Sequence, residues 1–162
     1  MVKTLAHSPA VIVRKLLIDM GELTLPSVDE DWPVYYDAEP PTPDEIAVIQ
    51  DTAGKTHGRI FTGEIQEHYG FQVMIRSGDR SRGWAKAHEI RSVMAESVLR
   101  ETVNWENAVY AIHAIDKIGP VLPIGKETPN SKRSLITLNA QVAVRSRSSL
   151  IGDWTDDGSG TT

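Results

Sequence analysis

Cysteine is absent from this sequence of 162 residues. The absence excludes disulfide bonds, thiol catalysis and cysteine-ligated metal sites. Long hydrophobic runs are absent too: the longest apolar stretch, residues 11–18, is interrupted by Arg14 and Lys15, whereas a membrane-spanning helix needs roughly 20 apolar residues. The N-terminus also lacks the apolar region and the small-residue cleavage site of a secretory signal. We therefore expect neither a membrane partner nor a leader peptide.

Positive charge is in deficit, because 17 basic residues face 22 acidic ones and the formal net charge is −5. The charges are also segregated along the chain. Residues 1–56 hold ten acids and four bases, residues 74–100 hold six bases and three acids, and residues 126–147 hold five bases and one acid. Nucleic-acid binders usually carry an overall basic excess, which this chain lacks. The segregation fits a protein that meets copies of itself or other proteins through complementary patches, and it fits solvated faces equally well.

The pattern of apolar residues predicts an α+β fold. The length suits one domain, which we expect to span residues 1–151, with residues 152–162 as a disordered acidic tail. Ser8 and Pro9 have the residue types that begin a helix, and Gly21 the type that ends one. We expect a second, longer helix over residues 80–100. Strands are expected at residues 32–36, 46–50, 59–62, 71–75, 108–116 and 132–145.

Apolar and polar residues alternate most clearly in the last of these strands, which indicates a sheet with one covered face and one polar face. The whole pattern predicts a mostly antiparallel sheet with two main helices packed on one face and a β-hairpin extension. The segment between the last two strands, residues 119–125, is unusually apolar for a connector. We interpret it either as packing over the end of the core or as a docking segment.

The stretch DTAGKTHG, residues 51–58, contains the Gly-Lys-Thr of a phosphate-binding loop. Such a loop needs a glycine five residues before Gly54, and position 49 is Ile. It also needs a helix after Thr56, but the residues that follow favour a strand. We therefore predict a polar hairpin tip that connects two strands.

Catalytic and metal-binding patterns find little support. No Gly-x-Ser-x-Gly motif is present, and no Ser, His and acid grouping stands out. Glu64, Glu67 and His68 make a weak metal set because no fourth ligand converges on them. His113 is expected in the core. The sequence therefore predicts no catalytic residues, no cofactor and no metal site.

Three segments, taken in order, resemble the tail-terminator proteins of long-tailed bacteriophages, a family also grouped with minor capsid and head-tail joining proteins. They are the aromatic strand WPVYY, the strand-to-helix unit GFQVMIRSGDRSRGWAKAHEI, and the C-terminal GPVLPIGKETPNSKRSLITLNAQVAVR. The resemblance covers roughly residues 8–146 and rests on the order of the segments more than on one signature. The strand from Gly70 to Arg76 and the helix after it match best, together with the final strand that carries Arg133 and Asn139.

The resemblance implies a structural virion protein without enzymatic activity. Members of the family form a ring, typically of six subunits, which stops the growth of the tail tube and joins the tail to the head connector. The implied partners are further copies of the chain, the tail-tube protein and a head-completion or connector protein, while genomic DNA passes through the lumen without specific binding. The implied location is the head-proximal end of the tail, after assembly in the host cytoplasm.

A ring contact needs two different complementary surfaces on each subunit. We expect basic residues on one surface and acidic residues on the other: Arg80, Arg82, Lys132 and Arg133 against Asp29, Glu30, Asp31 and Asp37. We expect contacts with other virion proteins at Lys55, His57, Val121, Leu122 and Ile124. Two other readings stay open, namely another neck, tail-completion or head-closure protein, and a small non-viral binding adaptor. A small hydrolase or nucleotide binder has the least support.

Overall fold

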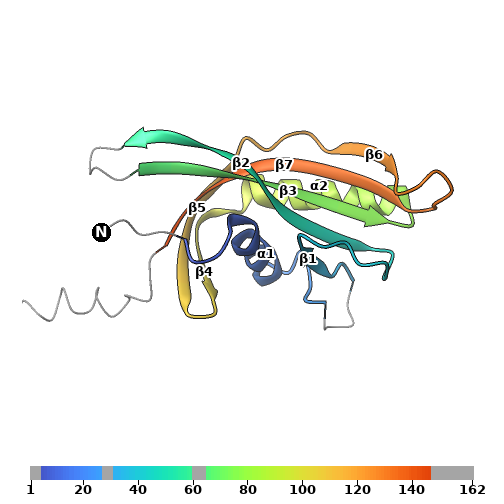
Figure 1. Cartoon of the computed structure of the whole chain (residues 1–162), viewed down its shortest axis with the longest axis horizontal. Helices are drawn as coiled ribbons and strands as arrows, with labels where there is room; N and C mark the ends of the chain where they lie inside the picture. The colour runs from blue at the N-terminus through green and yellow to red at the C-terminus, as the bar shows by residue number, and fades with distance from the viewer. Residues whose placement is uncertain (1–4, 27–30, 60–64, 147–162) are drawn as a thin grey trace, which may run out of the picture.

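The computed structural model of the chain describes residues 5–26, 31–59 and 65–146. Two helices and seven strands lie in these ranges (Figure 1), which confirms the α+β class. In chain order they are α1 (Pro9–Asp19), β1 (Val34–Tyr36), β2 (Ile46–Arg59), β3 (Ile65–Ser77), α2 (Arg80–Glu96), β4 (Leu99–Trp105), β5 (Ala108–Asp116), β6 (Leu122–Lys126) and β7 (Ser134–Ser146). Neither helix is long and apolar enough to cross a membrane. The tail predicted for residues 152–162 lies outside the described residues.

The described strands form one sheet in the order β1-β2-β3-β7-β5-β4, and β6 also pairs with β7. Every pair is antiparallel except β1 with β2, so the sheet is mostly antiparallel as predicted but mixed. β7 pairs with β3 along one edge. Its other edge is shared, because β6 pairs with residues 134–137 and β5 with residues 141–146. At the end of the sheet that carries β6, the strand order is therefore β1-β2-β3-β7-β6.

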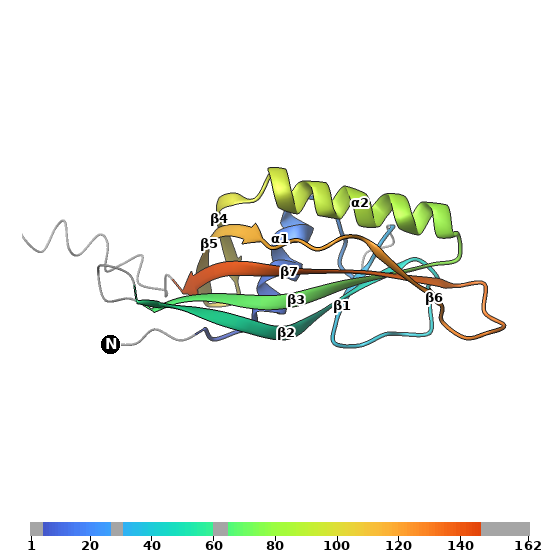
Figure 2. The ribbon, with the colours of Figure 1, turned by 90° about the horizontal axis from the view of Figure 1, so that it is seen from above.

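Both helices pack on one face of this sheet. Ser8 caps α1 through its side chain, which accepts a hydrogen bond from the backbone N–H of Val11, and Gly21 takes a left-handed conformation after the helix. Buried residues from both helices share one core cluster with the alternating apolar residues of β3 and β7. On β3 these residues are Phe71, Val73 and Ile75, all fully buried. Figure 2 shows α2 running along the length of the sheet.

The stretch DTAGKTHG is not a hairpin tip. Residues 51–58 lie inside β2, which continues to Arg59 and pairs with β3 over most of its length. The predicted strands at residues 46–50 and 59–62 are therefore not two strands joined by a turn, since β2 already spans 46–59. The predicted hairpin extension is present, but it is formed by β2 with β3, and β3 begins at Ile65, well before the predicted residue 71.

Two further strands were not expected. The second helix ends at Glu96, not at residue 100, and β4 follows at Leu99. Arg100 has a φ of 55°, which an α-helix does not accept, so the helix cannot extend to residue 100 as predicted. The apolar segment predicted as a connector contains β6. β1 follows Pro33 at the edge of the sheet, the position predicted for a strand next to proline.

Candidate interaction surfaces

The distal parts of β2 and β3 form an arm that projects from the body of the protein. β3 pairs with β7 as far as His68, which lies opposite Ala143. Beyond this point, residues 55–59 and 65–67 have strand pairs within the hairpin and with no other described strand. Figure 1 shows both strands extending past β5. We call these residues the hairpin arm. It includes the backbone of Lys55 and His57, whose side chains lie outside the described part of the structure.

Two glycines allow the strands to approach closely at the root of the arm. A β carbon on Gly54 would lie 2.9 Å from Cα of Tyr69, and one on Gly70 would lie 3.0 Å from the carbonyl carbon of Ala53. The pairing shifts register within residues 52–55, as it does at a β-bulge, which bends and twists the strands. The glycine of the Gly-Lys-Thr sequence is therefore explained by strand packing.

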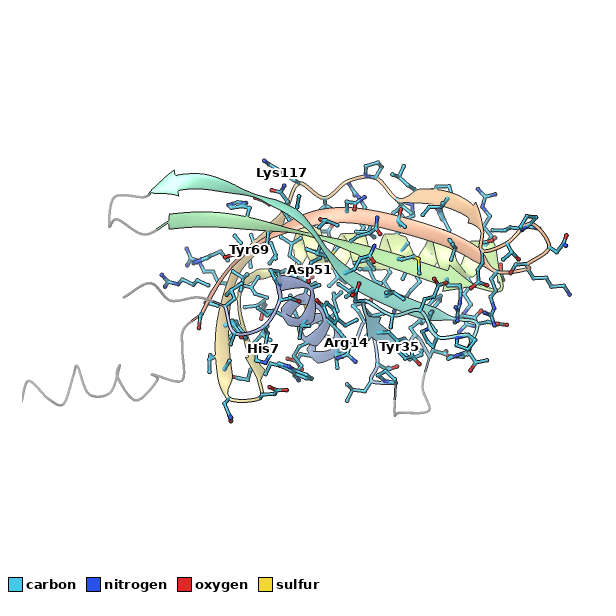
Figure 3. All side chains as sticks on the ribbon, viewed as in Figure 1. His7, Arg14, Tyr35, Asp51, Tyr69 and Lys117 are labelled. Carbon is cyan, nitrogen blue, oxygen red and sulfur yellow. The ribbon has the colours of Figure 1, made fainter. Side chains whose placement is uncertain are left out.

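Asp51, the first residue of DTAGKTHG, connects β2 to two other elements. Its Oδ1 accepts a hydrogen bond from the backbone N–H of Ala10 in the first turn of α1 (2.9 Å), and its Oδ2 accepts one from the hydroxyl of Tyr36 on β1 (2.8 Å). Figure 3 shows Asp51 beside the start of α1. A carboxylate at a helix N-terminus is favourable because the helix dipole is positive there. The described residues after Thr56, as far as Arg59, continue β2 and do not form a helix, so this part of the chain lacks the helix N-terminus that cradles a phosphate.

Two large apolar side chains are exposed on β6. Leu122 is 47% exposed and Ile124 is 62% exposed. β6 pairs with β7 along one edge and with no other described strand along the other. The exposure is compatible with the predicted contact role of these two residues. Val121 differs from the prediction, because it is 6% exposed and belongs to the core cluster, so it has little surface to offer a partner.

Trp84 is a third exposed apolar side chain near this edge, but it lies on α2 over the helix-covered face of the sheet, whereas Leu122 pairs with Thr137 and points to the other face. Trp84 is 40% exposed, and its ring contacts that of His88 at a tilt of 52°, with 4.6 Å between the ring centroids. Seven residues further along α2, Nε of Arg91 donates to the carbonyl of Gly119, just before β6 (3.0 Å). Residues seven apart lie on one side of an α-helix, so Trp84 also faces the β6 side. We call Leu122, Ile124 and Trp84 the β6-edge surface.

The charged residues predicted to join subunits are partly paired within the chain. Arg82 contacts Asp31 at 3.1 Å, although we expected these two on opposite sides of an interface, and Arg133 contacts Asp44 at 2.8 Å. Ion pairs at exposed sites contribute only about 0–1 kcal/mol, so such pairs exchange partners easily. Of the remaining predicted residues, Arg80, Lys132 and Asp37 are exposed, while Asp29 and Glu30 lie outside the described residues.

Arg76 is fully buried, on the face of the sheet opposite the helices. Its guanidinium donates hydrogen bonds to two backbone carbonyls of the proline-rich segment, Pro43 (2.6 Å) and Asp44 (3.4 Å). It also donates to the carboxylates of Glu39 (3.3 Å) and Glu127 (3.4 Å). One side chain thus fastens residues 39–44 and the β6–β7 connection to β3. The sequence did not predict the burial of Arg76.

The histidines do not assemble a metal site in the described part of the chain. His68 contacts Asp116 at 3.0 Å, and no group of three or more potential metal ligands occurs among the described residues. Glu64 and the side chain of Glu67, considered with His68 from the sequence, lie outside those residues. His113 is exposed and not in the core, because it occupies a bulge in β5 that interrupts the alternation of the strand.

His7 ties the segment before α1 to the β4–β5 hairpin (Figure 3). Its Nδ1 is hydrogen-bonded to the hydroxyl of Tyr110, and its Nε2 lies 3.1 Å from a carboxylate oxygen of Glu106. Tyr110 is fully buried, and this burial raises the pKa of its phenol above the ordinary value of 10.0. Because the phenol is buried and both ring nitrogens of His7 have partners, we interpret the group as structural.

Two solved structures resemble the chain weakly. One is the virion of a native gene transfer agent particle, with 12% sequence identity and a TM-score of 0.43 over 69% of this chain and 78% of that chain. The other, whose name states no function, has 16% identity and a TM-score of 0.47 over 83% of this chain and 92% of that chain. No protein-family model and no curated protein sequence matches. Because both TM-scores lie below 0.5, these are distant likenesses in chain fold.

Proposed function

We propose that the protein is a structural virion protein of a long-tailed phage. In this role, six copies of the chain form a ring that ends the polymerisation of the tail tube and joins the tail to the head connector. The proposal rests on the sequence resemblance over residues 8–146 and on one structural observation. The β6-edge surface exposes three large apolar side chains beside a strand edge that no described strand covers. Exposed apolar surface beside an open strand edge is a common feature of protein contact sites.

The hairpin arm supplies a second contact in this proposal. It projects beyond the body of the protein and carries Lys55 and His57. In the proposed assembly it extends toward a neighbouring ring. We propose that the arm contacts the tail-tube protein or the connector protein. The arm needs no catalytic chemistry for this purpose, and we propose neither a catalytic role nor a cofactor for the chain.

DNA passage is the third part of the proposal. Six chains of charge −5 carry a formal charge of about −30, which a closed ring concentrates around its lumen. We propose that acidic residues line the lumen, so that DNA slides through without being held. A ring structure with the basic residues of 74–100 or 126–147 in the lumen would overturn this part alone.

Native mass spectrometry and negative-stain microscopy of the purified chain test the proposal, with and without tail tubes. We expect a ring in solution, or a monomer that becomes a ring on the tubes, and tubes of abnormal length when the chain is left out of assembly. A ring elsewhere in the neck would favour another head-closure or tail-completion protein. A monomer indifferent to tubes would favour a non-viral adaptor, and a monomer that hydrolyses ATP would favour an enzyme.

A further inference from the structure

The β6-edge surface is surrounded by positive charge. Residues 117–133 hold four bases and one acid, and that acid, Glu127, is already paired with Arg76 and Arg133. Lys126 and Lys132 are exposed, and so is Lys117, which Figure 3 shows along this edge. On α2, Arg80 lies one turn before Trp84, is exposed, and forms no ion pair with any described residue. The surface therefore combines apolar side chains with unpaired cations.

The opposite edge of the sheet has the complementary character. Residues 31–45, which contain β1, hold five acids and no base. Leu25 and Tyr36 are exposed there, at 38% and 39%, so this edge also offers apolar area. Asp37 is exposed, and the side chain of Asp31 is 79% exposed even though it contacts Arg82. We call Leu25, Asp31, Tyr36 and Asp37 the β1-edge surface.

These two surfaces do not meet within one chain. β1 and β6 are the outer strands in the order β1-β2-β3-β7-β6, so four strand spacings separate them. Neighbouring strands lie about 4.8 Å apart, which makes the separation about 19 Å. Inside the chain the neighbouring segments touch only partly, where Arg133 contacts Asp44 and where Arg76 contacts both Glu39 and Glu127. The exposed Lys117, Lys126 and Lys132 form no ion pair with any described residue, so their charge is available to a second molecule. Two unlike surfaces on opposite edges give a head-to-tail contact, and head-to-tail contacts close into rings when the rotation between copies permits.

We infer that the β6-edge surface of one copy binds the β1-edge surface of the next. Leu122, Ile124 and Trp84 pack against the apolar side chains of the β1 edge, and the surrounding lysines and arginine face its carboxylates. This inference names the residues of the contact between subunits in the proposed ring, and it rests on the proposed function. It also replaces two residues of the sequence-based pairing, since Arg82 and Arg133 already have acidic partners in their own chain.

The contact is made by side chains and does not add a strand to the sheet. Pro123 has no backbone N–H to donate, and Gly125 has a φ of 124° at a register shift between β6 and β7. Proline and bulges at an edge strand prevent another strand from pairing with it. The edge therefore presents its apolar side chains while it resists open-ended strand addition.

Complementary charge reversal tests the contact directly. In one variant of the full chain, Lys126→Glu and Lys132→Glu make the β6 edge acidic. In the other, Asp31→Lys and Asp37→Lys make the β1 edge basic. We expect each variant alone to associate at least about tenfold more weakly than the unaltered chain, because like charges then face each other across the contact. An equimolar mixture is expected to assemble again, with the two variants alternating, because each edge then meets its opposite.

The control reverses two acids outside both surfaces, Glu96→Lys and Glu101→Lys, and is expected to assemble normally. A second, charge-independent variant, Ile124→Ser, is expected to weaken assembly while the thermal unfolding midpoint stays unchanged, because Ile124 is 62% exposed. Native mass spectrometry reads the composition of every assembly. Alternating mixed rings support the inference.

Two outcomes overturn the inference: normal assembly by either reversed variant, or a mixture that does not assemble although both variants are folded. If the unaltered chain forms rings in either case, the proposed function stands and only the contact is wrong. If the alternating rings form but tail-tube length does not depend on the chain, the contact stands and the proposed function is wrong. An unaltered chain that stays monomeric even on tubes overturns both.

Discussion

Replacing Arg76 by methionine tests how the proline-rich segment is held to the sheet. The change keeps a long apolar side chain in the buried site but removes every donor of the guanidinium. Four hydrogen bonds are lost, two to the carbonyls of Pro43 and Asp44 and two to the carboxylates of Glu39 and Glu127. Because Arg76 is fully buried, no water in the folded variant takes the place of the guanidinium as the hydrogen-bond donor.

The magnitude follows from the exposure of the partners. Removing one member of a fully buried ion pair costs about 3–5 kcal/mol, because the other charge is left without compensation. Here the side chains of Glu39 and Glu127 are 36% and 28% exposed, so water partly compensates them and the ion pairs contribute less. We therefore expect a loss of about 2–4 kcal/mol, dominated by the bonds to the two carbonyls. In a chain of this size, a loss of about 3 kcal/mol lowers the unfolding midpoint by roughly 6–12 °C.

Thermal unfolding followed by circular dichroism measures the effect, with Arg80→Met as the matched control. Arg80 is exposed and forms no ion pair with a described residue, so the same substitution there is expected to change stability by no more than about 0.5 kcal/mol. Limited proteolysis after glutamate adds a local readout, since the bond after Glu45 is expected to be cut faster in Arg76→Met. Equal unfolding midpoints for the two variants would refute the reasoning.

Three further predictions concern single side chains. Asp51→Ala is expected to cost about 1 kcal/mol in chemical denaturation, because the N–H of Ala10 loses its acceptor at the start of α1; no change would contradict this role. Burial raises the pKa of Glu22 above 4.5 despite Lys86 nearby, so its stabilising contribution is complete below the unfolded-state pKa and is lost as the pH rises through the folded-state pKa. Glu22→Gln should therefore gain stability relative to the unaltered chain as the pH rises above 4.5 through the folded-state pKa, and a loss over that range would contradict the assigned sign. Because burial also raises the pKa of Tyr110, stability is expected to fall as the pH rises from 10 through the folded-state pKa, and difference titration of tyrosinate absorbance against Tyr110→Phe should show a late-ionising phenol.

The parts of the fold that were predictable are those with a strong local signal. Ser8 and Pro9 start α1 because capping depends on residues within one turn. β5 has the predicted bounds, and β7 is within two residues of them, because both strands border the core and alternate between a covered and an open face. The two-helix, mostly antiparallel architecture followed from these elements.

The bounds of the two arm strands, and the strands β4 and β6, were missed for physical reasons. A two-stranded arm has no core to face, so residues 51–59 show no apolar alternation and their glycines suggest a turn. β6 contains Pro123 and Gly125, which are typical of loops but are tolerated at an edge. β4 begins shortly after α2 ends. In the sequence, the acid Glu96 and the base Arg100 therefore look like an ion pair on one more turn of the helix.

Only part of the candidate interaction surfaces could be predicted from the sequence. Leu122 and Ile124 could be predicted because they are apolar residues in a segment rich in proline and glycine. Val121 has the same local signal, and only the tertiary fold distinguishes it by burying it. The exposure of Trp84 depends on how α2 is oriented, which involves the contact of Arg91 with the distant Gly119. The burial of Arg76 depends on residues 39–44, which cover its guanidinium. One-dimensional periodicity contains no information on either.

The close crossing of Gly54 and Gly70 makes the reach of the arm independent of the rest of the molecule. The residues of β3 that pair with β7 lie on the body side of this crossing or directly beside it, and His68 is the last of them. Adding two residues to each arm strand lengthens the arm by about 7 Å and returns every side chain to its original face. The distance between this protein and the partner proposed for the arm can therefore change in fixed steps, while the core and both edges of the sheet stay unchanged.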